Sequence, residues 1–177
     1  ETPNGYSLYS FYKGYMLFFI EIGELENGLG KQMRVNYFVR YSTIDTTSNE
    51  YVGIQLSTPL NLGVKYFISF KLKATSRYRN GANNKIGALF STVKYTNVNP
   101  PPTNDFCQMW TDSIIVDSVN WVQVSGSFLA DSAYEYLTLG NFFTNAHTDT
   151  IRFWAPPPGV SFFLESYYFI DDVCVSE

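Results

Sequence analysis

Apolar and polar residues alternate along much of this chain with the two-residue period of a half-buried β-strand. From Tyr66 to Leu72 every second residue is apolar, and Ser69 and Lys71 lie between them. Successive side chains of a strand point to opposite faces, so the pattern predicts one face in a core and one in water. No segment shows helical periodicity over three turns. The same reasoning predicts strands near Met16–Ile22, Val35–Tyr41, Tyr51–Leu56, Tyr66–Leu72, Ile86–Ser91, Trp121–Leu129, Tyr136–Phe142, Phe162–Glu165 and Tyr167–Val175.

Turn-forming residues separate the predicted strands. Two of these segments contain proline triplets, Pro100–Pro102 and Pro156–Pro158, which cannot donate to a β-ladder and are predicted to be loops. The other predicted turns are Asn27–Gly30, Thr46–Asn49, Asn61–Gly63 and Arg79–Asn84. Short strands without intervening helices indicate an all-β fold of two packed antiparallel sheets, a β-sandwich. A length of 177 residues is typical of one domain, so residues 1–177 are predicted to form a single domain.

Composition agrees with a folded β-protein and excludes some partners. Hydrophobic residues make up 45% and charged residues 16% of the chain, which excludes a fully solvated disordered chain. The net charge of −4, without any Lys/Arg block, argues against nucleic-acid binding. The most apolar stretch, Tyr15–Ile22, is too short to span a bilayer. Cys107 and Cys174 leave two readings open, one disulfide bridge or free thiols that pack as small apolar residues.

Four segments in a fixed order carry a resemblance to a known family. They are NEYVGIQLSTPLNLGVKYFISFKLKA, KIGALFST, VNWVQVSGSFLADSAYEYLTLGNF and YYFIDDVCVSE, within residues 49–177. Together they resemble a jelly-roll module of surface and secreted proteins of gliding, polysaccharide-degrading bacteria, which is similar to the galactose-binding-like carbohydrate-binding modules. The resemblance implies a supporting module of a larger protein, located outside the cytoplasm, at the cell surface or in the periplasm.

The resemblance also implies a structural calcium ion in many relatives. In that wider fold a carboxylate of the last strand meets oxygen ligands from the start of the chain, and Asp171 and Asp172 interrupt an apolar run at the matching place. The opening ETPNGYSLYSF departs from the family's usual acidic opening. Two readings stay open: calcium held with the help of Asp171 or Asp172, or carboxylates that accept hydrogen bonds without a metal.

Aromatic and polar residues in loops are the candidates for holding a sugar, because a flat ring packs on its C–H face while polar groups bind its hydroxyls. The alternative reading is that these residues only cap the ends of the sandwich. Trp121 opens a predicted strand and is assigned to packing instead. The candidate residues are Trp110, Trp154, Tyr95, Asn141 and His147.

One motif suggests catalysis. The segment EIGELE, residues 21–26, resembles the carboxylate-bearing strand of a family of retaining β-glucanases, with Glu21 and Glu26 at the catalytic places. Retaining hydrolysis needs two carboxyl groups about 5 Å apart, whereas these two residues would face opposite sides of a regular strand. The alternative is a solvated acidic turn at Glu24 and Glu26.

Three function hypotheses follow from the sequence. The leading one is a noncatalytic extracellular module that binds carbohydrate or a cell-surface polymer. The second is a structural or adhesin module that contacts proteins, including other domains of the same protein. The third is a retaining glycosidase that uses Glu21 and Glu26.

Overall fold

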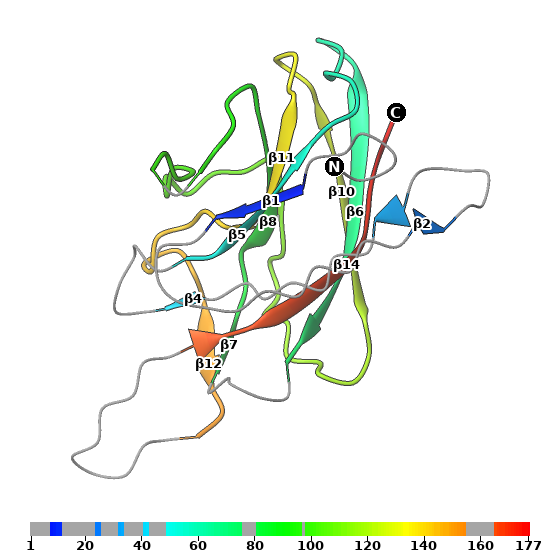
Figure 1. Ribbon diagram of the computed structural model, residues 1–177. Coiled ribbons are helices and arrows are strands. Elements are labelled where there is room, and N and C mark those ends of the chain that lie inside the picture. Colours follow the sequence, from blue (N-terminus) through cyan, green and yellow to red (C-terminus); the bar gives the residue numbers. More distant parts are fainter. Residues whose placement is uncertain are drawn as a thin grey trace.

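The chain folds into β-strands joined by turns and loops in the computed structural model (Figure 1). The structure describes residues 8–11, 24–25, 32–33, 41–42, 49–75, 81–96, 98–154 and 165–177. No described segment is a helix, so none is a helix that could cross a bilayer. The all-β prediction is therefore confirmed.

Most of the strands belong to two five-stranded antiparallel sheets. The first sheet has the order β1–β5–β11–β8–β9, and the second has the order β10–β6–β14–β3–β2. The strands of the first sheet are β1 (Leu8–Phe11), β5 (Tyr51–Gln55), β11 (Tyr136–Asn141), β8 (Ile86–Ser91) and β9 (Met109–Trp110). The strands of the second sheet are β10 (Val122–Leu129), β6 (Lys65–Ala74), β14 (Tyr168–Ser176), β3 (Gln32–Met33) and β2 (Glu24–Leu25).

Two short strand pairs lie outside the main sheets. One joins β12 (Thr150–Arg152) to β7 (Gly81–Asn83), and the other joins β13 (Glu165–Ser166) to β4 (Tyr41–Ser42). The pair of β12 and β7 lies beyond one end of the sandwich (Figure 1). The last residue of β7, Asn83, leads through Asn84 and Lys85 directly into β8.

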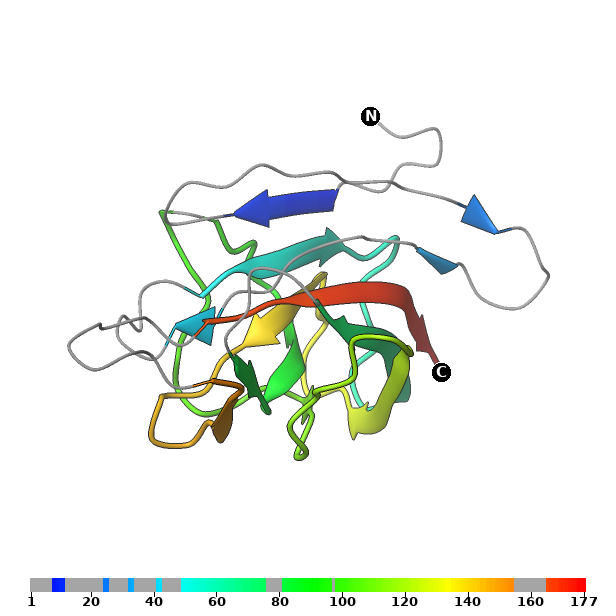
Figure 2. The ribbon, with the colours of Figure 1, turned by 90° about the horizontal axis from the view of Figure 1, so that it is seen from below.

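The connectivity identifies the sandwich as a jelly roll. The long strands β5, β6, β8, β10, β11 and β14 belong alternately to the first and the second sheet as the chain proceeds. Each connection therefore crosses from one layer to the other, and hydrogen-bonded neighbours are distant in sequence. Figure 2 shows the two layers edge-on, with β5, β11 and β8 in one and β14, β6 and β10 in the other.

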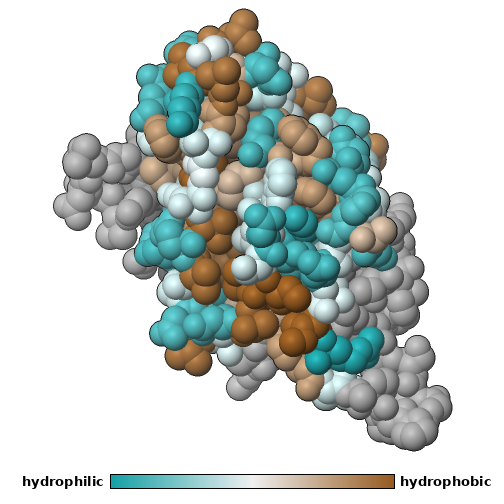
Figure 3. All heavy atoms as spheres, turned by 180° about the vertical axis from the view of Figure 1, so that it is seen from behind, coloured by the Kyte–Doolittle hydropathy of each residue, from teal (hydrophilic) through white to brown (hydrophobic). Residues whose placement is uncertain are grey.

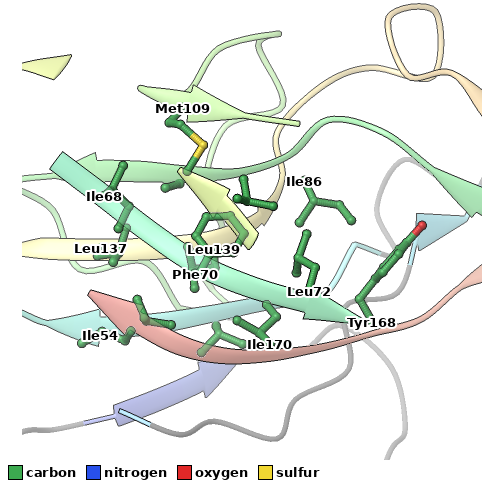
Figure 4. Packing of buried hydrophobic residues seen from close by; sticks show 14 of the residues in the cluster. Ile54, Ile68, Phe70, Leu72, Ile86, Met109, Leu137, Leu139, Tyr168 and Ile170 are labelled. Atoms are coloured by element: carbon green, nitrogen blue, oxygen red, sulfur yellow. The ribbon is translucent and has the colours of Figure 1, made fainter. Parts of the chain in front are cut away.

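The main core lies between the two sheets (Figure 4). Along β6 the inward residues Tyr66, Ile68, Phe70 and Leu72 are 0–5% exposed, as their alternation predicts. They pack against inward residues of the opposite sheet, among them Ile54, Ile86, Leu137 and Leu139, which are labelled in Figure 4. Burial of one such side chain contributes about 1.5–3 kcal/mol, so this layer is the main source of the domain's stability.

A second apolar cluster covers the outer face of the first sheet. It contains Tyr51, Leu89, Cys107, Phe142 and Phe143, with Tyr95 packed against it. Tyr95 and Cys107 come from the connection between β8 and β9, so this loop folds back over the sheet.

Glycines make the close packing of this second cluster possible. A Cβ atom at Gly140 would collide with the ring of Tyr51, and one at Gly87 would collide with Cys107 Sγ and lie 2.5 Å from the carbonyl oxygen of Met109.

The predicted strands within residues 49–154 and in the last segment all form. Before residue 49, the short strands β1, β2 and β3 were not predicted, and Glu24, which was read as part of an acidic turn, lies in β2. Three short strands after residue 49 were not predicted either. Arg79–Asn84 was predicted as a turn, but Gly81–Asn83 forms β7. The strands β9 and β12 were also missed. The strands predicted near 16–22, 35–41 and 162–165 and the proline triplet at 156–158 lie wholly or largely outside the described residues. Both cysteines are free thiols, so the bridge is not formed.

Candidate functional site

Four side chains meet where β8 begins and the antiparallel β9 ends. We call this group, Lys85, Trp110, Asp112 and Phe143, the Trp110 corner. The ring of Trp110 meets that of Phe143 edge to face, with centroids 5.3 Å apart. The Lys85 ammonium lies 5.3 Å from the centroid of each ring. Trp110 Nε1–H donates to Asp112 Oδ1 at 3.0 Å, and Lys85 Nζ donates to the same oxygen at 3.1 Å.

The backbone places Lys85 at this corner through an uncommon conformation. Lys85 has a φ of 60°, in the left-handed region that residues other than glycine seldom occupy. Its N–H donates to the carbonyl oxygen of Thr111 at 2.8 Å, and the N–H of Thr111 donates to the carbonyl oxygen of Ile86 at 3.0 Å. Backbone strain of this kind persists only where the surroundings over-determine it, and it is concentrated at functional sites.

Charge and exposure make the corner a polar aromatic surface. Trp110 is 38% exposed, and the side chain of Asp112 is 84% exposed, whereas that of Lys85 is only 19% exposed. Hydrogen bonds from Lys85 and then from Trp110, with the nearby ammonium charge, hold the pKa of Asp112 below its usual value. The carboxylate is therefore ionised at neutral pH and fixes the indole by its N–H.

A second polar group borders the corner through Phe143. Asp105 Oδ1 accepts hydrogen bonds from Thr144 N–H at 2.7 Å and from Thr144 Oγ1 at 2.8 Å. His147 Nδ1 lies 2.9 Å from Asp105 Oδ2. The backbone N–H of Thr144 is the main cause that lowers the pKa of Asp105, with further contributions from the Thr144 hydroxyl and from His147. Asp105 also has a left-handed φ, 62°.

Two other predicted residues support this region from within. Asn141 is fully buried; its Oδ1 accepts the N–H of Phe143 at 2.8 Å, and its Nδ2 lies 3.3 Å from Thr148 Oγ1. Its amide holds the segment that carries Phe143 and does not reach the surface. Tyr95 is half-buried against the second apolar cluster, and burial raises its pKa. Of the five predicted residues, Asn141 and His147 therefore lie in the 141–147 segment, and Trp110 and Tyr95 pack against it.

The fifth predicted residue, Trp154, lies after β12. It is 44% exposed, and Ile151 and Phe153 beside it are 43% and 42% exposed. Figure 3 shows that, on the face turned away from the viewer of Figure 1, apolar side chains gather in patches between polar ones. Exposed aromatic residues of this kind are available for contact with a partner.

Asp171 and Asp172 lie at an irregularity of β14. The register of β14 against β6 shifts between Asp171 and Cys174, and Asp172 has a φ of 50°. Asp172 forms an ion pair with Lys71 of β6, and Asp171 Oδ1 accepts the N–H of Asp172 at 2.8 Å.

The described residues alone do not assemble a calcium site at this acidic pair. An ammonium group already neutralises Asp172, and no three His, Cys, Asp or Glu side chains of the described residues come together as a metal site. Ligands from the start of the chain would lie outside the described residues, so the calcium site stays a prediction.

The outer face of the second sheet carries another surface. A shallow hollow of about 300 Å³ is lined mainly by outward serines of β6, β10 and β14, with Phe67 and Cys174. Trp121 was assigned to packing, but it is 36% exposed on this face, with Lys73 Nζ 4.7 Å from its ring centroid. The assignment is wrong because Trp121 has the same strand parity as the outward serines of β10.

Sequence reasoning missed Lys85, Asp112, Phe143 and Asp105. Lys85 begins the segment KIGALFST, but that segment gave no sign of a site, and the four residues are brought together by the pairing of β8 with β9 and by the loop that covers the first sheet. The only local signal is an acidic residue two positions after Trp110. Glu21 and Glu26 lie outside the described residues, so the glycosidase hypothesis stays a prediction.

Comparisons with known proteins identify no family, and they return solved structures of low similarity. No family model and no curated protein matches the chain. Among solved structures, the CBM22-1 xylan-binding domain of Paenibacillus barcinonensis Xyn10C is 12% identical, with a TM-score of 0.42, over 98% of this chain and 86% of that one. The Clostridium thermocellum endo-1,4-β-D-xylanase 10B CBM22-1–GH10 modules, complexed with xylohexaose, are 13% identical, with a TM-score of 0.33, over 80% of this chain and 24% of that one. At these values the likeness carries no argument about a ligand, and the jelly-roll assignment rests on the strand order.

Proposed function

We propose that this domain is a noncatalytic, extracellular carbohydrate-binding module and that it binds its ligand at the Trp110 corner. The observation that carries the proposal is a partly exposed indole whose N–H, neighbouring ring and flanking charges are all fixed by the fold. Carbohydrates combine apolar C–H faces with hydroxyl groups, and such a site offers a surface for each.

The corner divides the binding work between its residues. The exposed part of Trp110 would pack against a sugar ring, and the exposed Asp112 carboxylate would accept hydrogen bonds from its hydroxyls. Lys85 is held between the aromatic rings and Asp112, so it positions both and supplies an N–H donor. Because these groups are ordered before binding, little conformational entropy is lost when the ligand arrives.

Asp105, Thr144 and His147 extend the polar surface beyond Phe143. A ligand longer than one sugar ring would reach them from the corner. The Thr144 hydroxyl and the Asp105 carboxylate already bind each other, so they supply acceptor capacity with fixed geometry.

Affinity electrophoresis and calorimetry test the proposal by measuring how the isolated domain binds a panel of soluble plant, fungal and bacterial polysaccharides. Trp110→Ala is expected to weaken binding about 30-fold, the effect of removing an aromatic hot spot worth about 2 kcal/mol. Phe67→Ala is the matched control, since Phe67 is an aromatic residue that is 49% exposed against 38% for Trp110, but it lies on β6 of the other sheet. Absence of binding to every polysaccharide, or equal losses in both variants, would contradict the proposal.

A further inference from the structure

Strand β10 has a long edge that no described residue pairs with. It is the terminal strand of the second sheet and is hydrogen-bonded in continuous register to β6 along Val122–Leu129. On its other side Figure 2 shows no described strand. The edge of the first sheet, in contrast, is formed by β9, which has only two residues.

This edge lacks the devices that usually prevent strand pairing. Exposed edges are normally protected by charged side chains, proline, bulges or short length. Val122–Leu129 spans eight residues and contains no charged residue and no proline, and its pairing with β6 shows no register shift. The edge is therefore competent to accept another strand by β-augmentation.

The sequence of β10 is complementary to itself in antiparallel orientation. With a two-fold axis at Ser125, Gln123 faces Ser127 on the outer side of the sheet. On the inner side Val122 faces Phe128, and both side chains are already partly buried against the core. Polar residues thus meet polar ones, and apolar residues meet apolar ones, as stable cross-strand pairs require.

The same axis also pairs the exposed apolar residues at the two ends of the strand. Trp121 is 36% and Leu129 is 64% exposed, and both lie on the outer side. In the antiparallel arrangement Trp121 of one copy lies against Leu129 of the other, so both lose exposure. The outward residues of β10 between them, Gln123, Ser125 and Ser127, carry no charge.

We propose that two copies of this chain form a symmetric dimer by antiparallel pairing of their β10 strands about Ser125. The two second sheets then become one continuous sheet. Each copy uses its own β10 edge, so the contact closes at a dimer and does not propagate into fibres. An interface of one strand pair is smaller than the roughly 1,600 Å² of standard interfaces, so we expect weak association in which monomer and dimer exchange.

Sedimentation velocity over a range of concentrations tests the dimer, and a charge exchange tests its register. Ser125→Lys places two lysines opposite each other at the axis and is expected to raise the dimer dissociation constant about fivefold, as is Ser125→Glu. An equimolar mixture of the two variants is expected to restore or exceed the association of the wild-type chain, because Lys then faces Glu.

A matched variant and a fold check complete the experiment. Thr150→Lys adds the same charge on β12, outside the sheet that contains β10, and is expected to leave the association unchanged. Ser125 is exposed, so both of its variants are expected to fold, and circular dichroism checks that they do. A wild-type chain that stays monomeric at all concentrations, assembly beyond a dimer, or a Lys/Glu mixture that associates no better than either variant alone overturns the proposal. Trp110→Ala is expected to weaken glycan binding without changing the dimer, so the two proposals fail separately.

Discussion

Replacement of Tyr168 by phenylalanine tests how the end of the sandwich beneath the Trp110 corner is held. Tyr168 is 1% exposed, and its hydroxyl accepts the N–H of Asn83 at 2.8 Å and donates to the carbonyl oxygen of Asn83 at 3.1 Å. It thereby ties β14 to β7, two residues before Lys85. Phenylalanine keeps the ring and removes only the oxygen.

The expected loss follows from the groups left behind. A buried polar group that loses its partner costs about 1–3 kcal/mol. Here the N–H of Asn83 loses its bond to the hydroxyl, and its carbonyl oxygen keeps only the long hydrogen bond from the N–H of Ile115 at 3.4 Å. For a domain of this size each kcal/mol lowers Tm by about 2–4 °C, so Tyr168→Phe is expected to lower Tm by about 2 to 12 °C. Urea unfolding followed by circular dichroism gives the free energy of unfolding independently of heating.

Tyr66 provides the comparison. Its hydroxyl also has two partners, the N–H of Asn61 and Glu177 Oε1, both at 3.0 Å, but these hydrogen bonds are only partly buried. Water can replace the lost oxygen there, so Tyr66→Phe is expected to cost about 0.5–1.5 kcal/mol. If Tyr168→Phe proves as stable as the wild-type chain, or less destabilising than Tyr66→Phe, the reasoning about the buried hydroxyl is refuted.

Three further outcomes are expected. Gly140→Ala destabilises the domain by about 1–3 kcal/mol, because its Cβ meets the ring of Tyr51; Tyr51→Ala in the same chain should relieve the penalty, and denaturant midpoints show whether it does. Burial raises the pKa of Cys107 to about 12, above its unfolded value near 9. The stability that the buried thiol contributes is therefore fully present below pH 9, and the free energy of unfolding falls as pH rises toward 12, at up to about 1.4 kcal/mol per pH unit. Cys107→Ala should flatten that decline in alkaline unfolding curves. The pKa of Asp105 is lowered, so the stability that its carboxylate contributes is present above about pH 4 and is lost as pH falls through the folded pKa. The amide chemical shift of Thr144 should titrate with that pKa, and this titration should disappear in Asp105→Asn.

The parts of the fold that sequence could predict are those with a local periodic signal. The strand β6 alternates over ten residues and was found from its pattern alone. The strands β7, β9 and β12 have two or three residues, too few to show a period, and their existence depends on partners elsewhere in the chain. The bulge at Asp171 and Cys174 left no mark in the sequence, so the faces of the two aspartates were not predictable.

The candidate site was predictable in residue type but not in arrangement. Trp110 and His147 were found because aromatic and polar residues in loops suit a sugar. Asn141 was chosen for its polar side chain although it lies at the end of a predicted strand, and its amide is satisfied inside the fold, which only the hydrogen-bond network shows. In the sequence Lys85 is an ordinary charged residue before a predicted strand, and its role depends on a left-handed φ and on two rings from distant segments.

The alternation of strands between the two layers has a consequence for how the domain is made. The central strand β6 pairs with β10 and with β14, whose residues lie roughly 50 and 100 positions later in the chain: Ser69 is opposite Ser125, and Ile68 is opposite Val175. During synthesis β6 is therefore complete long before either neighbour exists, and its two hydrogen-bonding edges stay unpaired until residues near 125 and 175 have emerged. Topologies dominated by such distant pairings fold in milliseconds to seconds, so the nascent chain spends that interval in need of protection from aggregation.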